Sequence, residues 1–257
     1  MLQNFFFPHL DPSHLRNRRS FLSLFTSYAD RTNAAQRSTE IMVRSYPNIV
    51  ITGTPGTGKS THSSLLVSTY SPPSSGSSSS SHPLRQIDVG MLVKKEGFYT
   101  EYLEEWQSYE VNEDQLLDHL EPLTGTKAPE PLDSDEFDQQ DLERAKSLGE
   151  DAEERGGLVL DWHTCDVWPE RWVDLVVVLR CDHGVLWQRL EKRGYTLKKI
   201  QENNEAEIMG VVADDARSSY PAEAVVELQS QESGDVEENV ERIIQWIHAW
   251  RQARGLE

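Results

Sequence analysis

Residues 53–60, with the sequence Gly-Thr-Pro-Gly-Thr-Gly-Lys-Ser, constrain the fold of this chain more than any other segment. They follow an apolar run at 48–52 and precede a stretch with a helical pattern of apolar residues. A Gly-rich turn between a strand and a helix directs successive backbone N–H groups at one anion, and the helix N-terminus adds a partial positive charge. The segment therefore predicts a phosphate-binding loop (P-loop) for a nucleoside triphosphate, with a solvated Gly-rich turn as the alternative.

Each residue type in the loop suits one contact with a triphosphate. Gly56 and Gly58 let the backbone approach phosphate without a Cβ in the way. Lys59 can reach the β and γ oxygens, and the Ser60 hydroxyl can ligate Mg²⁺. Thr61 adds a hydroxyl beside the α-phosphate. We therefore expect these five residues to bind ATP with Mg²⁺.

Three polar segments account for the mean hydropathy of −0.60 in this 257-residue chain. Residues 1–46 contain six Arg and three acidic residues, residues 68–83 form a Ser-Pro-Gly tract, and residues 127–155 contain 11 acidic and four basic residues. Such segments bury too little apolar surface to offset chain entropy, so we expect them to be mostly disordered. The remainder, about 170 residues, suits one domain. We predict a disordered extension at 1–46 and a P-loop kinase domain over 47–257, with insertions at about 68–83 and 127–155.

The N-terminal extension is rich in Arg and Ser and poor in acidic residues, a composition typical of organellar transit peptides. Two simpler interpretations are a disordered extension without a targeting role, and a start codon placed too far upstream, since Met42 lies just ahead of the first predicted strand. A native N-terminus near Met42 would exclude the targeting interpretation.

The net charge of −18 argues against a broad nucleic-acid surface, because such surfaces need clustered Lys and Arg. It suits a basic protein partner, and the alternative is that the charge only keeps the chain soluble. Cys165 and Cys181 are too few for a disulfide framework or a four-Cys zinc site, which favours a reducing compartment and no zinc. No apolar run reaches the length of a membrane span, so we expect no membrane association.

Five apolar runs of strand length alternate with helical patterns, which indicates a parallel sheet covered on both faces. The last helical pattern is the clearest, since Asp235 and Glu238 have the spacing of a capping box and are followed by an apolar stripe that we interpret as core. The predicted strands are Ile49 to Thr52, Arg85 to Asp88, Leu158 to Asp161, Leu175 to Leu179 and Val225 to Leu228.

The predicted strand at 158–161 ends in a carboxylate, Asp161, and continues as Asp-Trp-His-Thr-Cys-Asp through residue 166. In a P-loop fold such a carboxylate lies beside the phosphate loop and helps to hold Mg²⁺. Polar side chains at the carboxyl end of a parallel strand are also where such sheets bind ligands. Asp161 is therefore a candidate metal-binding residue together with Ser60.

A run of basic residues follows the fourth predicted strand and is interrupted by Gly194 and Tyr195. Phosphoryl transfer requires charge neutralisation around the moving group, so a mobile cationic lid is the expected device. A solvated helix end is the alternative, and we prefer it for Lys198 and Lys199. Arg193, at the corner between helix and lid, is the best candidate for an arginine that reaches the triphosphate. The run comprises Arg189, Lys192, Arg193, Lys198 and Lys199.

Taken together, these motifs are highly specific, and the chain resembles the adenylate kinase isoenzyme 6 family. The members are small nuclear adenylate kinases, also described as coilin-interacting ATPases and as ribosome-assembly factors. The resemblance covers residues 47 to about 251, apart from the Ser tract and the acidic insertion. It rests on Pro-Asn-Ile at 47–49 with the loop that follows, Ile-Asp-Val-Gly at 87–90, the segment 161–166, Pro-Glu-Arg-Trp at 169–172, and Arg189 to Tyr195.

This resemblance implies an α/β P-loop nucleoside-monophosphate-kinase fold, with a five-stranded parallel sheet, helices on both faces and a short lid near 192–202. It implies an AMP-binding segment near 88–111, catalytic importance for Asp161 and His163, and an ATP contact for Arg193. The family lacks a long zinc-bearing lid. It also implies ATPase activity and a location in the nucleus and cytoplasm.

Two residues of this chain, Met91 and Lys94, stand where we expect Asp and Arg in the relatives. The affinity for AMP and the selectivity for it are therefore open at the sequence level.

The leading hypothesis is transfer of the γ-phosphoryl group of ATP to AMP, with Lys59 bridging the β and γ oxygens. No strong general base is needed, because a nucleotide phosphate is already anionic. A second hypothesis is an ATP-switched assembly factor that docks a basic small-subunit ribosomal protein within the pre-ribosome. A third is a kinase for another small hydroxylated metabolite, which would require Asp161 or His163 as a general base.

Overall fold

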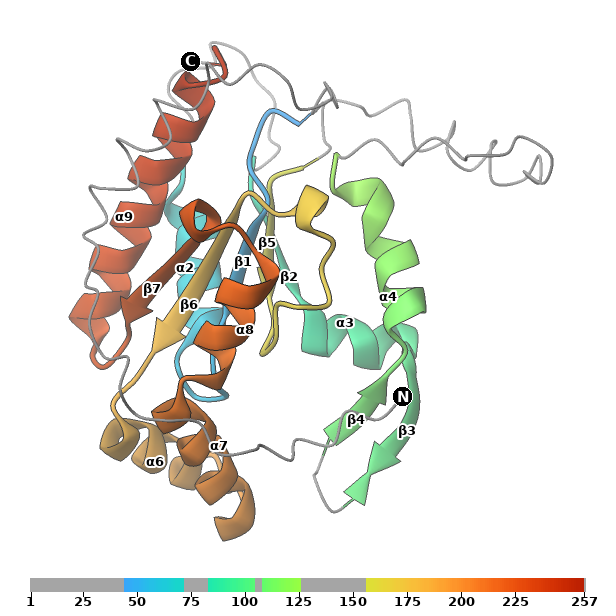
Figure 1. Cartoon of the computed structure of the whole chain (residues 1–257), viewed down its shortest axis with the longest axis vertical. Coiled ribbons are helices and arrows are strands. Elements are labelled where there is room, and N and C mark those ends of the chain that lie inside the picture. Colours follow the sequence, from blue (N-terminus) through green and yellow to red (C-terminus); the bar gives the residue numbers. More distant parts are fainter. Residues whose placement is uncertain (1–43, 72–82, 105–107, 126–155, 257) are drawn as a thin grey trace, which may run out of the picture.

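The computed structural model describes residues 44–71, 83–104, 108–125 and 156–256. Five parallel strands form one sheet in the order β2-β5-β1-β6-β7, as Figure 1 shows. All five predicted strands are confirmed, and the last two are one residue longer than expected. Their bounds are β1 Ile49–Thr52, β2 Arg85–Asp88, β5 Leu158–Asp161, β6 Leu175–Arg180 and β7 Val225–Gln229.

The register of the central strands brings the predicted motifs to one edge of the sheet. β1 and β5 are fully buried, consistent with their apolar composition. Ile51 of β1 pairs with Asp161, which in turn pairs with Asp88 at the end of β2. Because the strands are parallel, the P-loop after β1 and both carboxylates lie at the carboxyl edge.

Helices cover both faces of the sheet, as predicted (Figure 1). Helices α2 and α9 pack on the face that carries Ile49 and Ile51. Helices α3, α4 and α8 pack on the opposite face with Val50. The helices are α2 Lys59–Thr69, α3 Val89–Glu96, α4 Glu113–Leu120, α8 Val211–Ser219 and α9 Ser233–Gln252, with short 3-10 turns η2 Glu121–Leu123, η4 Glu170–Trp172 and η5 Ala222–Ala224.

Two further helices, α6 His183–Lys192 and α7 Leu197–Met209, extend beyond the carboxyl edge (Figure 1). They share a small core of Leu186, Leu190 and Ile200. The predicted lid at 192–202 is the corner between them and the first turns of α7. The short connection between the two helices begins at Arg193, which lines the same cleft as the P-loop.

An antiparallel hairpin, β3 Tyr99–Leu103 with β4 Ser108–Val111, was not predicted. It lies apart from the main sheet, and most of its residues are exposed or half-buried. Strands that bury neither face carry no apolar run, so the signal that located the other five strands is missing here.

The capping box of α9 lies three residues earlier than predicted. Glu232 is the N-cap residue, and the Asp235 carboxylate accepts hydrogen bonds from the backbone N–H groups of Gln231 at 2.7 Å and Glu232 at 3.0 Å. The assignment of Asp235 as the N-cap, with Glu238 as its partner, was therefore wrong. The apolar stripe does form core, through Val240, Ile243, Ile247 and Trp250.

Ordered structure reaches into two of the segments expected to be disordered. Arg44 is buried, and its Nε donates to Asp174 Oδ2 at 2.9 Å. Helix α2 continues to Thr69, and the buried Tyr70 follows it. Residues 1–43 of the predicted extension, most of the Ser tract and the whole acidic insertion lie outside the described residues.

Glycine residues tie the chain together where it enters β5, at the amino edge of the sheet. Gly156 N–H donates to Leu123 O at 2.9 Å, and Arg85 N–H donates to Gly157 O at 2.8 Å. Gly157 has φ +70°, and a Cβ there would lie 2.2 Å from the Pro83 carbonyl oxygen. The described chain therefore resumes at residues 83 and 156 close together at this edge, opposite the P-loop.

A buried histidine links the P-loop helix to α9. His62 Nδ1 lies 2.9 Å from Gly58 O, so this nitrogen carries the proton and donates it. Nε2 then accepts from Asn239 Nδ2 at 3.2 Å, and the same Asn239 amide donates to Gln229 O at 2.7 Å. Burial lowers the pKa of His62 from its ordinary value of 6.5, so the imidazole is neutral at pH 7.

We expect His62 to make the fold sensitive to acid. Because the folded-state pKa lies below the unfolded value of 6.5, the unfolded chain binds more protons, and stability falls as the pH drops from about 6.5 through the folded pKa. Thermal unfolding midpoints between pH 7.5 and 5 should fall less steeply in His62→Gln than in the wild type. His183→Gln, a change at an exposed position, should show the same dependence of the unfolding midpoint on pH as the wild type. Identical slopes for wild type and His62→Gln would contradict the expectation.

Candidate functional site

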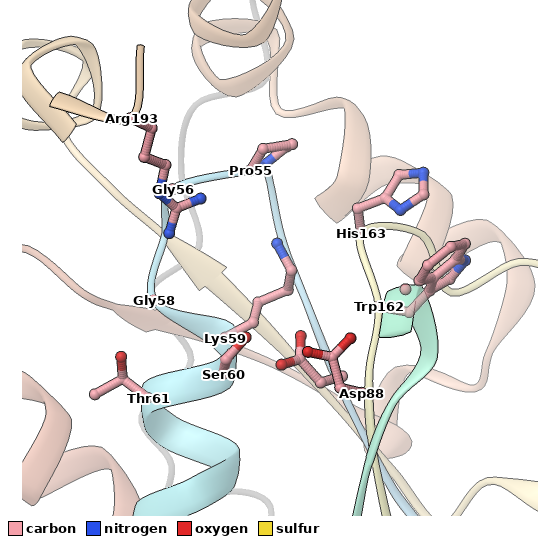
Figure 2. Close-up of a pocket in the computed structure, with 12 residues that line it drawn as sticks. Pro55, Gly56, Gly58, Lys59, Ser60, Thr61, Asp88, Trp162, His163 and Arg193 are labelled. Atoms are coloured by element: carbon pink, nitrogen blue, oxygen red, sulfur yellow. The ribbon is translucent and has the colours of Figure 1, made fainter. Parts of the chain in front are cut away.

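A cleft of about 230 Å³ opens at the carboxyl edge and contains every site residue predicted from the sequence. Figure 2 shows the P-loop and the start of α2 on one side, the ends of β2 and β5 on the other, and Arg193 above. The structure places these residues around one cleft, and the role of each residue is still a prediction. The lining residues are Pro55, Gly56, Gly58, Lys59, Ser60, Thr61, Asp88, Gly90, Asp161, Trp162, His163 and Arg193.

Two glycines of the P-loop are favoured by their backbone conformation, and both lie close to side chains of neighbouring segments. Gly56 has φ +101°, and a Cβ there would lie 2.8 Å from Leu186 Cδ1 of α6. Gly58 caps α2 with φ +95°, and its Cβ would lie 3.1 Å from Ser230 Oγ. From the sequence, these glycines were expected only because they let the backbone come close to a phosphate group. The structure adds close contact with α6 and with the connection after β7.

Lys59 folds back over the P-loop. Its Nζ donates to Gly53 O at 2.8 Å and to Thr54 O at 3.2 Å. Burial lowers the pKa of Lys59 to about 8, with a further lowering from Arg193, while Asp161 acts in the opposite direction. The ammonium form therefore still predominates at neutral pH, and a bound polyanion would favour it further.

Asp161 is almost fully buried at the base of the cleft, with 5% of its surface exposed. Burial raises the pKa of this carboxyl, while a hydrogen bond from Ser60 and the charge of Lys59 lower it. Its Oδ2 has no hydrogen-bond partner among the described residues. A buried carboxylate oxygen beside a hydroxyl is a donor set that fits Mg²⁺, which prefers oxygen ligands.

Asp88 also lines the cleft, although from the sequence it was not expected to be a site residue for ATP or metal. It caps α3, and its Oδ1 accepts from Met91 N–H at 2.9 Å. Asp88 is the last residue of β2 as Asp161 is the last residue of β5, and the two residues pair in the sheet. The Met91 side chain is 68% exposed, and Lys94 Nζ lies 5.6 Å from the centre of the Tyr109 ring.

His163 and Trp162 form the rim of the cleft, with ring centroids 4.3 Å apart (Figure 2). The His163 side chain is exposed, yet crowding by the surrounding protein and the charge of Lys59 lower the pKa of its imidazole. Neutral His163 is therefore the form at pH 7. The segment is held from below by Tyr220 Oη, which donates to Trp168 O at 2.9 Å.

Of the predicted basic run, Arg193 lines the cleft and Arg189 has a different role. Arg189 Nη1 donates to Gly56 O at 3.2 Å and to Ser230 O at 2.9 Å. It therefore ties the P-loop to the connection after β7. Lys199 Nζ lies 4.6 Å from the centre of the Tyr195 ring. Within the described part of the chain, Arg189, Lys192, Lys198 and Lys199 are not lining residues.

Replacing Arg193 by Met should impair use of ATP much more than a change at the neighbouring Lys192. A charge-assisted contact to phosphate lost from the cleft is expected to lower kcat/KM about 10–100-fold. Lys192→Met, which removes an exposed charge one residue away, is the matched control and should stay near wild type. Steady-state kinetics with varied ATP check the expectation, and equal values for the two variants would contradict it.

No helix among the described residues has the length and hydropathy to cross a membrane. The described residues also contain no group of three or more His, Cys, Asp or Glu side chains placed to hold a metal ion. Cys165 and Cys181 are buried free thiols.

Residues 49–210 match the family model described as "AAA domain". An adenylate kinase isoenzyme 6 homolog of Schizosaccharomyces pombe is 40% identical over 81% of this chain and 96% of its own length. The homolog HBR1 of Candida albicans is 40% identical over 80% of this chain and 71% of its length. The homolog FAP7 of Saccharomyces cerevisiae is 38% identical over 79% and 83%.

Proposed function

Because the chain belongs to the adenylate kinase isoenzyme 6 family, we propose that it transfers the γ-phosphoryl group of ATP to AMP. The P-loop kinase fold and the named relatives support a nucleotide kinase. AMP as acceptor, Mg²⁺ as metal and an accompanying ATPase activity belong to the proposal. The observation that carries it is the meeting of Lys59, Asp161 and Arg193 around one cleft.

The cleft residues divide the work between positioning and charge neutralisation. Lys59 reaches the β and γ oxygens, and Arg193 approaches from the opposite side. Ser60 and Asp161 would hold Mg²⁺, which neutralises phosphate charge when bound. His163, being neutral, orients a phosphate or a water molecule by hydrogen bonding. An AMP phosphate is anionic at neutral pH, so no side chain has to remove a proton from a poorly acidic group.

A coupled assay of ADP formation from ATP and AMP tests the proposal. We expect turnover that depends on AMP and on Mg²⁺. Other nucleoside monophosphates measured beside AMP would report the acceptor selectivity, which Met91 and Lys94 leave open. Small hydroxylated metabolites in the same assay address the third hypothesis. ATP consumption that depends on such a compound, with no response to AMP, would overturn the AMP assignment.

A second candidate role is an ATP-switched factor that docks a basic small-subunit ribosomal protein on the pre-ribosome, in the nucleus and cytoplasm. The observation that favours it is the net charge of −18, which complements a cationic partner. The test is ATP turnover without AMP in the presence of the purified partner, with fractionation of nuclei and cytoplasm for the location. Absence of both binding and stimulation would remove this role.

A further inference from the structure

Glu207 is a buried carboxylate outside the cleft, near the C-terminal end of α7, and it joins three segments of the chain. Only 4% of its surface is exposed. Its Oε2 accepts from Thr54 Oγ1 at 2.6 Å. Its Oε1 accepts from Arg180 Nε at 2.8 Å and from Cys181 N–H at 3.0 Å. Glu207 therefore connects α7 to the P-loop and to the end of β6.

Thr54, the P-loop partner of Glu207, is itself a centre of contacts within the loop. It is 2% exposed, so its hydroxyl has little access to water. Its carbonyl oxygen accepts from Lys59 Nζ at 3.2 Å and from Thr57 Oγ1 at 2.9 Å. The side chain of this residue is thus held by Glu207, while its backbone holds Lys59.

Keeping a carboxylate at this depth is expensive, because a buried charge loses hydration that an apolar residue would not need. Both Glu207 oxygens are satisfied, and Arg180 supplies the compensating charge. Arg180 also donates from Nη2 to the Glu207 backbone oxygen at 2.8 Å and from Nη1 to Glu227 Oε2 at 3.1 Å. The ion pair with Arg180 would be sufficient to join α7 to β6. The second carboxylate oxygen, Oε2, instead accepts a hydrogen bond from Thr54 in the P-loop.

We propose that Glu207 is a positioning residue for the P-loop: it fixes Thr54 and, through the Thr54 carbonyl, the ammonium group of Lys59. The effect on turnover rests on the proposed function, whereas the effect on triphosphate binding requires only the P-loop. A loop whose key carbonyl is fixed in advance loses less freedom when phosphate binds. Glu207 thereby makes the end of α7 part of the nucleotide site without touching the cleft.

The first test compares Thr54→Val with Thr54→Ser. Valine keeps the shape but removes the hydroxyl, and we expect ATP binding in EDTA, measured by calorimetry, to weaken about tenfold. Serine keeps the hydroxyl and should restore the affinity to within about threefold of wild type. The kcat for AMP phosphorylation should fall in Thr54→Val at least as much as the affinity, because Lys59 alignment matters most in the transition state.

Arg217→Gln is the matched control for a purely structural effect. Arg217 pairs with Glu227, in the outer part of the same ion-pair network, and with Asp214, whereas no hydrogen bond or ion pair among the described residues joins it to Thr54 or Glu207. Unfolding midpoints without nucleotide are measured for every variant. Arg217→Gln should bind ATP like the wild type whatever its midpoint.

A double-mutant cycle decides whether Glu207 acts through Thr54. Glu207→Ala and Thr54→Val should each weaken ATP binding, and the double variant should bind no more weakly than the weaker single variant. The proposal would be overturned if the double variant lost ATP affinity by the product of the two single losses. It would also be overturned if Thr54→Val bound ATP as tightly as the wild type, or if Thr54→Val and Thr54→Ser had equal affinities. Should Glu207→Ala fail to fold, the Val and Ser pair decides alone. If the wild type does not phosphorylate AMP, the proposed function fails while the binding comparison still tests Glu207.

Discussion

Lys59→Met is expected to lower kcat for ADP formation by about 10²–10³-fold while the protein stays folded. The ammonium group is the cation that the structure places inside the P-loop, where it donates to the loop carbonyls and faces the cleft. Methionine preserves most of the length and volume but provides no charge for the developing phosphate oxygens. The measurement is the coupled assay with saturating ATP and AMP, on wild type and variant.

Arg242→Met is the matched control, because it removes a positive charge from a partly exposed position on α9, outside the cleft and the predicted AMP-binding segment. It should retain wild-type kcat and KM. Equal rates in the wild type and Lys59→Met would contradict the assignment of the P-loop as the phosphoryl-transfer site. If Lys59→Met kept the wild-type kcat but bound ATP more weakly, Lys59 would contribute to ATP binding and not to the transfer step.

Asp161→Asn should have an effect of similar size, a loss of kcat of about 10²–10³-fold, because it removes the buried carboxylate that fits a metal ion. The same change should not lower stability. Burial raises the folded-state pKa of Asp161 above its unfolded value of 3.8, so the ionised side chain costs stability above the folded pKa, and this cost fades as the pH falls towards 3.8. At neutral pH the Asn variant should therefore unfold at an equal or higher temperature.

Calorimetry under two conditions checks the Asp161 prediction independently of turnover. Calorimetry of ATP binding with Mg²⁺ and with EDTA should show a metal-dependent gain in the wild type and a smaller gain in Asp161→Asn. Asp118→Asn, an exposed change on α4, should match the wild type in all respects. A variant that keeps full activity, or that keeps the whole metal-dependent gain, would exclude Asp161 as a metal-binding residue.

Four of the five parallel strands could be predicted because each is an apolar run bounded by polar residues, whereas β2, with the sequence Arg-Gln-Ile-Asp, is half-buried and contains one apolar residue. The cleft residues were found for a related reason: the P-loop is a local motif, and Asp161 directly follows a buried strand. Local sequence also suggested Arg193, which stands where a helix ends. Where the structure depends on residues that are neighbours in the sequence, the pattern along the chain was sufficient to predict it.

What sequence reasoning missed depends on residues far apart in the chain. The bond from Thr54 to Glu207 joins residues 153 positions apart, and neither residue stands in a local pattern that marks the other. Arg189 looked like one more lid cation, yet its partners are carbonyls of the P-loop and of the connection after β7. The hairpin β3–β4 escaped because its strands bury no continuous apolar face.

The glycine junction around Gly156 and Gly157 has an evolutionary consequence. Extra sequence that leaves and rejoins the domain at the amino edge adds its length at the end farthest from the phosphate chemistry. Mutation can therefore lengthen, shorten or recompose these stretches while the reaction centre remains under separate selection. For the protein engineer, the same junction is a rational insertion point for a reporter domain, since its two flanks are already held close by the hydrogen bond between Gly156 and Leu123.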